Sequence, residues 1–495
     1  KRSRKRTLAF YLGVMFISVG LFFAGLLGTT QVTQQLARRE FTVVANNLTT
    51  TNQTTADAVQ WGKLPFLLSL LRPQQATLNA VFSLPMLDTS SQMLEAEKTV
   101  RKALELRDAR TEKMATLYSI LVGQSTGDVV EATTALSQDV VTAQELATAL
   151  TNASSQLPEP LSSALASASA ELLPSTTDRK QDLLTKSLLP QLAGLTGTTG
   201  IRRYVVVLQN SQELRPTGGF IEAIGILTFN GGSLISQDIY SSYQLDARLP
   251  GEIKPPLDLT STLGETQWWL HDANWFADGS AAGGQVLWFI EKTLQQAPDG
   301  VIFINTAGLP KLLRSLGPME MQVFNEVLTE KNIAERLEFH NELPNQISPD
   351  KPEYRQELLR QILNKLTTLP PEQVPTLFST IHTLLDEKQM LLSLKTVDDQ
   401  KVFRQLGWTG DLTFPTCPSA YVANGCVVDG LALVESNIGA NRANAYIARQ
   451  QEHTAVLSRS GVRHERKIQY TNSATTKAWP KGDYRTYLRV YMPGK

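Results

Sequence analysis

The sequence predicts an N-terminal transmembrane helix and an α-helical bundle or stalk, followed by an α/β fold. Three observations lead to this prediction. Residues 31–200 are rich in Leu, Ala, Thr, Ser and Gln and show helical periodicity. Asn230-Gly231-Gly232 is a hairpin signal that follows an apolar β-type run. After residue 201 strands alternate with helices, which predicts a three-layer α/β domain with a mixed sheet.

The N-terminal segment has the pattern of a membrane anchor. Residues 1–6 read KRSRKR, and residues 7–37 carry no charge. About 20 apolar residues are enough to cross the hydrocarbon core of a bilayer. The basic flank predicts a cytoplasmic N-terminus and an extracytoplasmic bulk, with residues 1–30 as leader and single-pass span. A cleaved signal peptide is the alternative, because it also begins basic and then becomes apolar.

Composition limits the class of protein. The 495 residues are enough for two to four domains, and we expect them to be a segment of a longer chain. The net charge is zero, so there is no electrostatic argument for a nucleic-acid partner. A hydrophobic content of 42% and a charged content of 19% are typical of an ordinary globular ectodomain.

Two cysteines, Cys417 and Cys426, lie in a loop rich in Pro, Gly and Asn. In an oxidising compartment we expect them to form a local disulfide. Their spacing does not match a C-x-x-C redox or zinc pair, so a structural clip is the favoured interpretation.

Four regions follow the span. Residues 31–200 form the predicted extracytoplasmic helical bundle, with its clearest helix at Met93–Leu121. Residues 201–328 form the α/β core, residues 329–396 a helical insertion, and residues 397–495 a β-rich part that completes or follows the core. In the core, strands are expected at Tyr204–Leu208, Phe220–Phe229, Ser233–Tyr240, Gly300–Asn305 and Met319–Phe324. In the last part they are expected at Leu431–Glu435, Ala445–Leu457, Val462–Asn472 and Tyr484–Tyr491.

The polar turn between the first two strands is the leading candidate site. It holds Asn210, Glu213, Arg215, Gly218 and Gly219. Glycine turns at strand ends bring backbone N–H groups close to ligands, and a guanidinium beside a carboxylate suits phosphate or pyrophosphate. The alternative is a capped surface turn in which Glu213 and Arg215 merely form an ion pair.

A second candidate is the aromatic and polar cluster WWLHDANW, which holds His271, Asp272, Asn274 and Trp275. It could stack on a sugar or on a lipid-linked glycan, or it could be a loop fixed by buried tryptophans. The five histidines of the chain are scattered without metal-ligand spacing, so no metal site is predicted from them. Arg442, in SNIGANRANAY, could line a polar cleft, although Asn and Gly at this density mainly form turns.

Five motifs occur in order, and together they identify a family. They read QNSQELRPTGGF, WLHDANWFAD, APDGVIFINTAGLPKLLRSLGPMEM, ESNIGANRANAYI and YRTYLRVYMP. The series resembles an uncharacterised bacterial membrane-anchored family, domain of unknown function four-thousand-twelve, over about Ile201 to Pro493. The resemblance implies a location in the bacterial cell membrane and a fold, but no reaction.

The same layout is distantly similar to the LytR-CpsA-Psr family of wall glycopolymer transferases. That resemblance implies a polyprenyl-pyrophosphate substrate, a divalent cation such as Mg²⁺, and catalytic roles for Arg215, Glu213, Asp246 and Asp272. Gly283-Gly284 would lie at the N-terminus of a helix, where a backbone N–H group could face an anion. Two departures weaken the match: Asn210 stands where an aspartate is expected, and Leu245 stands where an arginine is expected.

Two functions of different classes therefore remain open. The first is a membrane-anchored, extracytoplasmic envelope protein that binds a glycan or a protein partner without catalysis. The second is a LytR-CpsA-Psr-like phosphotransferase. The first is favoured, because the set of acids and arginines expected for the second is incomplete.

Overall fold

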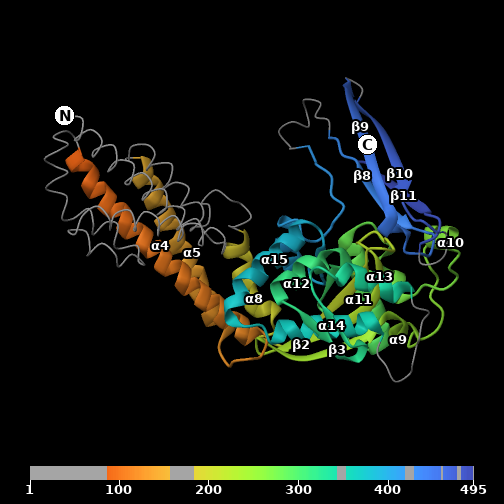
Figure 1. The fold of residues 1–495 in the computed structure, drawn as a ribbon, viewed down its shortest axis with the longest axis horizontal. Helices are drawn as coiled ribbons and strands as arrows, with labels where there is room; N and C mark the ends of the chain where they lie inside the picture. The colour runs from red at the N-terminus through yellow and green to blue at the C-terminus, as the bar shows by residue number, and fades with distance from the viewer. Residues whose placement is uncertain are drawn as a thin grey trace, which may run out of the picture. The chain divides into compact units, whose positions relative to one another are not determined.

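The computed structural model describes residues 86–155, 183–342, 353–417, 428–458, 461–476 and 481–493 (Figure 1). The chain divides into two compact units. Residues 1–111 and 135–185 form the first unit, and residues 112–134 and 186–495 form the second.

The α-helices are α4 (Met86–Leu121), α5 (Val129–Ser155), α8 (Leu189–Leu195), α9 (Ser242–Asp246), α10 (Leu257–Leu263), α11 (Gly279–Leu294), α12 (Leu309–Leu316), α13 (Ile333–Glu342), α14 (Tyr354–Thr367), α15 (Val374–Asp386) and α16 (Val397–Gln405) within the described ranges. The strands there are β1 (Arg202–Asn210), β2 (Phe220–Asn230), β3 (Ser233–Ser241), β4 (Gly300–Asn305), β5 (Met319–Met321), β6 (Glu326–Leu328), β7 (Met390–Leu394), β8 (Ala432–Asn437), β9 (Ile447–Ser458), β10 (Gly461–Asn472) and β11 (Thr486–Tyr491). A short 3₁₀ segment, η3 (Leu270–Trp275), connects α10 to α11.

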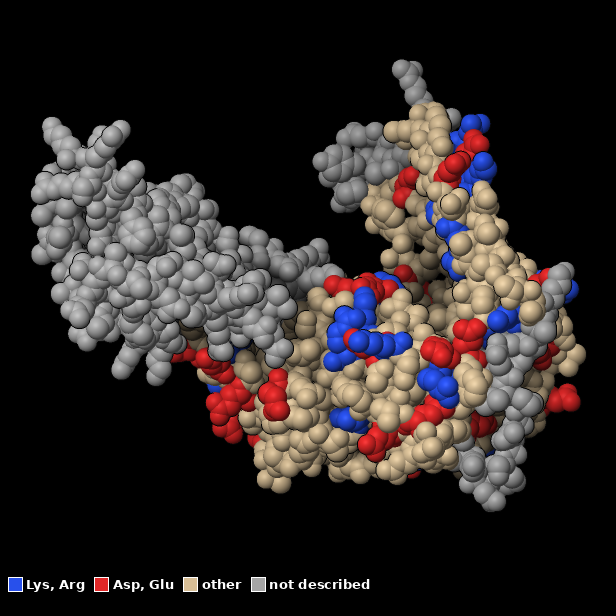
Figure 2. All heavy atoms as spheres, viewed as in Figure 1, with Lys and Arg blue, Asp and Glu red and all other residues tan. Residues whose placement is uncertain are grey.

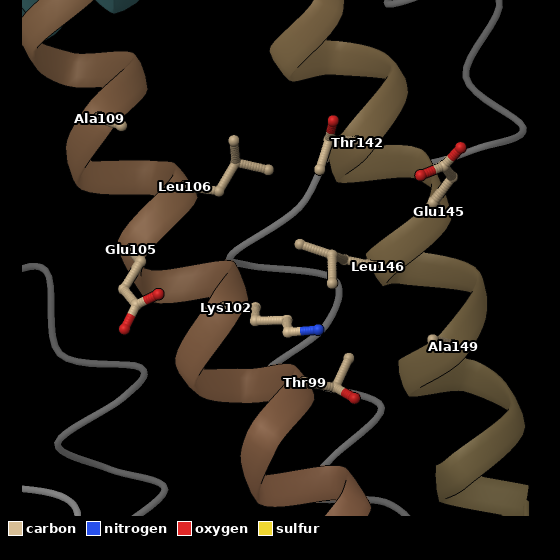
Figure 3. Close-up of a pocket in the computed structure, with 9 residues that line it drawn as sticks. All are labelled: Thr99, Lys102, Glu105, Leu106, Ala109, Thr142, Glu145, Leu146 and Ala149. Carbon is tan, nitrogen blue, oxygen red and sulfur yellow. The ribbon is translucent and has the colours of Figure 1, made fainter.

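In the first unit, α4 and α5 border a groove of about 620 Å³ (Figure 3). Leu106 and Leu146 point into the space between the helices, whereas Glu105 and Glu145 point away from it. The helix predicted at Met93–Leu121 is present and begins earlier, at Met86. The groove is lined by Thr99, Lys102, Glu105, Leu106, Ala109, Thr142, Glu145, Leu146 and Ala149.

None of the helices in the described ranges is long and apolar enough to cross a membrane. The predicted span within residues 7–37 lies outside those ranges, and so does Cys426. Both the span and the disulfide therefore stay predictions.

The second unit is built on a five-stranded mixed sheet with the order β3-β2-β1-β4-β7. β1 is antiparallel to β2 and parallel to β4, so the prediction of a mixed sheet is confirmed. β1 lies in the centre and is buried on both faces from Tyr204 to Asn210. This explains why its sequence is a continuous apolar run and does not alternate.

Helices cover both faces of this sheet. On one face, Val205 and Val207 of β1 share a hydrophobic cluster with Val286 and Phe289 of α11. On the other face, Gly225 of β2 lies against Leu359 and Leu363 of α14. The result is an α/β/α layering around the sheet, with the main core between the sheet, α11 and η3.

Strand β7 was not foreseen. The sequence placed Met390–Leu394 at the end of a helical insertion, but in the structure it pairs antiparallel with β4. The five-residue run MLLSL follows α15 without a Gly or Pro turn signal, and so short an apolar run cannot be distinguished from buried helix by periodicity. Residues 354–386 in the same region are mainly helical, as α14 and α15.

The C-terminal strands form two separate ribbons. β8 pairs antiparallel with β11, and β9 pairs antiparallel with β10 over 12 residues on each strand. The Tyr470 hydroxyl of β10 donates to Glu435 of β8 at 2.6 Å, which ties the ribbons together. All four strands were predicted, with ends that differ by a few residues.

Candidate functional site

The polar turn between β1 and β2 closes because two glycines let the backbone come very close to its surroundings. Gly218 has φ of 137°, and a side chain there would collide with Asn305. A Cβ on Gly219 would lie 2.1 Å from the carbonyl oxygen of Asn210. Both glycines were predicted as binding residues. In the structure, Gly219 serves the close approach of the ends of β1 and β2, and Gly218 serves the close approach of the turn to Asn305 at the end of β4.

A β-bulge turns a carboxylate of β2 into this region. Leu208 pairs with Ala223 while Gln209 pairs with Ile221, so Glu222 is an extra residue without a partner in the ladder. Bulges re-aim side chains at the edges of sites. Glu222 is buried and accepts a hydrogen bond from Asn210 Nδ2 at 2.8 Å.

Arg215 is held entirely by the protein. Its side chain is 2% exposed, its Nε lies 2.6 Å from Asp272 Oδ1, and its Nη2 lies 3.1 Å from Glu213 Oε1. Its Nη1 donates to the backbone carbonyl of Asn437 at 2.9 Å. The guanidinium thus joins the β1–β2 turn, η3 and the end of β8.

Arg442 lies between two carboxylates. Its Nη1 contacts Glu213, and its Nη2 lies 3.2 Å from Glu222 Oε1. Glu222 also contacts Arg355 at the start of α14. Burial lowers the pKa of the Arg442 guanidinium to about 10, which still leaves it charged at neutral pH.

Asp246 and Asp272 are joined through His271. Asp246, the last residue of α9, accepts from Leu270 N at 2.6 Å and pairs with His271 Nδ1 at 2.6 Å. His271 Nε2 lies 3.8 Å from Asp272 Oδ2. Both oxygens of Asp246 are therefore engaged, and they orient the imidazole ring.

These contacts connect the side chains into one continuous network, which we call the ionic cluster. In order along the chain of contacts, it consists of Asp246, His271, Asp272, Arg215, Glu213, Arg442, Glu222 and Arg355. Four carboxylates face three guanidiniums, so the cluster has an excess of carboxylate whenever His271 is neutral. Glu353 adds a further acid beside Arg355, and burial raises its pKa.

Aromatic rings cover one side of the ionic cluster. The ring of Phe220 lies under the guanidiniums of Arg215 and Arg442, at 5.5 and 5.7 Å from its centroid. Its other neighbours are His271 at 4.9 Å and Tyr243 at 6.4 Å between ring centroids. Trp269 stacks on His271 at 6.3 Å. We call Tyr243, Trp269 and His271 the aromatic rim.

The rim reaches solvent through Tyr243, which is 52% exposed. Partial burial, followed by the nearby carboxylates of Glu222, Glu353, Asp246 and Asp272, raises the pKa of Tyr243 to about 12. Its phenol therefore stays neutral and able to donate a hydrogen bond at physiological pH.

Two predicted binding residues belong to the core. Asn274 is fully buried, and its Nδ2 donates to Thr217 Oγ1 at 2.9 Å and to the Gly219 carbonyl at 2.8 Å. Trp275 is 1% exposed and stacks on Tyr487. Both fix η3 against its neighbours, as the alternative interpretation of this loop expected.

Gly283-Gly284 does not open a helix. α11 begins at Gly279 with Asp278 as its N-cap, so the glycine pair lies inside the helix. A Cβ on Gly283 would meet Ser393 of β7 at 2.2 Å, which shows that the residue allows close helix–sheet packing.

Sequence reasoning missed Glu222, Tyr243 and Arg355. A signal for Glu222 exists, because it is the single charge in the apolar run FIEAIGILTF. Tyr243 is the second residue of the short helix α9, where an exposed aromatic residue is unremarkable in sequence. Arg355 comes from a helix 133 positions after Glu222, and no local pattern indicates their contact.

The carboxylates of the ionic cluster do not fit a cation site as they stand. Asp246 is occupied by Leu270 and His271, and Asp272 by Arg215. Across the part of the chain that the structure describes, no group of three or more His, Cys, Asp or Glu is arranged to hold a metal ion.

Comparison with known proteins supports the first family resemblance. Residues 199–340 match the family model described as "Protein of unknown function (DUF4012)", which confirms the resemblance over that range. The extension of the resemblance to Pro493 stays a prediction. No curated protein matches the chain.

Several solved structures match part of the chain at low similarity. Protein gbs0355 from Streptococcus agalactiae is 16% identical, covering 45% of this chain and 76% of its own, with a TM-score of 0.27. TagV from B. subtilis is 10% identical, covering 44% and 88%, with a TM-score of 0.23. The transcriptional regulator yvhJ from Bacillus subtilis is 10% identical, covering 42% and 76%, with a TM-score of 0.22. At this level of likeness the function stays open.

Proposed function

We propose that this chain is a membrane-anchored protein of the bacterial cell envelope whose α/β domain binds an envelope glycan at the aromatic rim. One observation carries the proposal. Tyr243, Trp269 and His271 form a group of rings beside a polar cluster that has more carboxylates than guanidiniums.

This combination has the chemistry of a sugar site. The faces of aromatic rings pack against the apolar C–H faces of a pyranose, while their polar ends form hydrogen bonds. The exposed Tyr243 hydroxyl can donate a hydrogen bond to a sugar oxygen and accept one from a sugar hydroxyl. A few oriented polar groups beside aromatic surface are what a specific small-molecule site requires.

The charges favour a neutral ligand over a phosphate. Each guanidinium of the ionic cluster already contacts at least one carboxylate. A phosphate would have to displace a carboxylate from its guanidinium and would meet the other carboxylates of the cluster at close range. An uncharged glycan does not have to displace a carboxylate and is not repelled by the carboxylates.

The location in the proposal comes from the sequence. The uncharged residues 7–37 behind the basic residues 1–6 support a single-pass anchor with a cytoplasmic N-terminus. The domain would then lie outside the membrane, where cell-wall glycans are available to it. A protein partner of the envelope is the alternative ligand.

The Tyr243→Ala variant tests the glycan site. We expect it to lose at least about tenfold in affinity for the best ligand from an array of bacterial surface glycans, because the exposed ring face is removed. Phe378→Ala is the matched control. This ring is also partly exposed but lies on α15, which packs against β7 at the opposite edge of the sheet. Equal glycan binding by both variants and the unmodified protein would contradict the proposal.

Phosphotransfer from a polyprenyl pyrophosphate is the second candidate. One observation favours it: Arg442 Nε is buried and has no hydrogen-bond partner among the described residues. A buried guanidinium nitrogen without an acceptor is costly, and a phosphate oxygen would satisfy it. Because the acids do not fit a cation, we derive no catalytic step for this candidate.

Calorimetry with inorganic pyrophosphate separates the two candidates. If the second is correct, the unmodified protein binds pyrophosphate and Arg442→Ala weakens binding by at least about tenfold. Arg449→Ala is the control, because Arg449 pairs with Glu435 outside the ionic cluster. No pyrophosphate binding by the unmodified protein would exclude this candidate and leave the glycan site unaffected.

A further inference from the structure

The β9–β10 ribbon carries two histidines that face each other. His453 on β9 pairs in register with Arg466, and His464 on β10 pairs with Ala455, so the histidines are diagonal neighbours. Residues two positions apart on a strand share a face of a ribbon, and His464 is two positions from Arg466, the partner of His453. Both histidine side chains therefore lie on the same side. Acidic and basic side chains are interspersed along this part of the surface (Figure 2).

The two imidazole rings meet through their nitrogens. His453 Nε2 lies 2.9 Å from His464 Nδ1, with the ring centroids 5.1 Å apart and the planes inclined by 25°. The second nitrogen of His464, Nε2, lies 2.7 Å from Asp429 Oδ1. The order of contacts is therefore carboxylate, imidazole, imidazole.

Asp429 determines which nitrogen of His464 carries the proton. A carboxylate accepts, so His464 Nε2 donates to it and His464 Nδ1 keeps a free lone pair. A carboxylate behind a histidine in this way orients the ring and raises its basicity, as it does for histidine ligands in metal centres. The lone pair of His464 points at His453.

From this geometry we propose that His453 Nε2 and His464 Nδ1 bind a divalent transition-metal ion of the zinc class, with Asp429 as the orienting group. Imidazole nitrogens are preferred ligands of Zn²⁺, Ni²⁺ and Cu²⁺. On binding, His453 carries its proton on Nδ1 and presents Nε2 to the metal. Water completes the coordination, so the site is open and distinct from a closed structural site.

The distances are compatible with this role after a small adjustment. Two Zn–N bonds of about 2.0–2.1 Å at a tetrahedral angle place the nitrogens roughly 3.3 Å apart, so they must separate by about 0.4 Å. His453 is exposed and can make this movement without disturbing a packed core. Arg466 is opposite His453 in register, and its guanidinium donates a hydrogen bond to the Gln451 side chain on β9.

Asp429 does not act as a third ligand. It contacts the nitrogen of His464 that faces away from His453, so the three groups do not surround one point. This agrees with the finding that the described residues contain no cluster of three or more metal ligands. The site therefore has two protein ligands and one orienting carboxylate.

Calorimetry with Zn²⁺ on the full chain, without a histidine tag, tests the proposal. We expect one saturable site, with affinity reduced at least about tenfold in His453→Ala and in His464→Ala, since each removes one of two ligands. Asp429→Asn should weaken binding by about tenfold, as expected when an orienting carboxylate is lost. Mg²⁺, which prefers oxygen ligands, should not bind this site.

His382→Ala is the matched control. His382 is also partly exposed and lies near a carboxylate, Asp386, at 3.9 Å, but no second histidine among the described residues faces it. Its loss should leave Zn²⁺ affinity unchanged. Unchanged affinity in His453→Ala, or equal losses in His453→Ala and His382→Ala, would overturn the proposal. Because His453 is exposed, its variant keeps the fold, and circular dichroism verifies this.

Discussion

Replacing Arg215 with alanine is expected to lower the free energy of unfolding of the α/β unit by about 3–5 kcal/mol. The side chain is 2% exposed and bonds to Asp272 and Glu213, which are almost as deeply buried. Removing the guanidinium leaves buried Asp272 without a guanidinium and leaves Glu213 with Arg442 alone, so Asp272 must take up a proton or open the site to water. Urea unfolding followed by tryptophan fluorescence measures the change.

Arg314→Ala is the control for this experiment. Arg314 also pairs with a glutamate, Glu330, but its side chain is 71% exposed. Surface pairs of this kind contribute about 0–1 kcal/mol, so little change is expected. If Arg215→Ala lowered the free energy of unfolding no more than Arg314→Ala does, the ionic cluster would be hydrated, and its carboxylates would not need the Arg215 guanidinium to stay ionised.

The stability test also bears on function. Arg215 was predicted as a catalytic arginine that binds pyrophosphate, yet all three of its nitrogens are occupied by the protein. An arginine with this environment first holds the β1–β2 turn, η3 and β8 together. Among the guanidiniums of the cluster, Arg442 is the better candidate for a ligand, because its Nε lacks an acceptor within the described ranges.

Much of the central sheet could be predicted from local sequence. β1, β2 and β4 are apolar runs, and β3 is indicated by the hairpin turn Asn230-Gly231-Gly232 that precedes it. β7 could not be predicted, because it becomes a strand only by pairing with β4, far away in sequence. Its five residues carry no signal that separates a strand from the end of a helix.

The candidate site could be predicted only in part for the same reason. Glu213 and Arg215 were selected because they stand in a polar turn between two predicted strands, Asp272 because it lies in an aromatic and polar cluster, and Asp246 because of the resemblance to the LytR-CpsA-Psr family. The structure brings all four into one series of contacts. The remaining members depend on tertiary register. Glu222 enters the cluster because of a bulge, and Arg355 because α14 packs on β2.

A methyl group at Gly219 is expected to be the most damaging small change in this region. In Gly219→Ala the new Cβ would lie 2.1 Å from the oxygen and 2.3 Å from the carbon of the Asn210 carbonyl, and 2.8 Å from Ser211 N. All three are backbone atoms, so no side-chain rotation relieves the clash and the ends of β1 and β2 must separate. We expect a loss of about 3 kcal/mol in the free energy of unfolding, at the upper end of the usual cost of overpacking.

The same separation should weaken ligand binding, because Phe220 follows directly and supports both His271 and the guanidiniums. Gly284→Ala in α11 is the matched control. A Cβ added at Gly284 would meet no described atom outside its own helix within 4 Å, and alanine is preferred to glycine inside a helix. That variant should gain about 0.5–1 kcal/mol. If Gly219→Ala were as stable as the unmodified protein, the turn would be able to open freely, and the close contact of β1 with β2 could not be what assembles the ionic cluster.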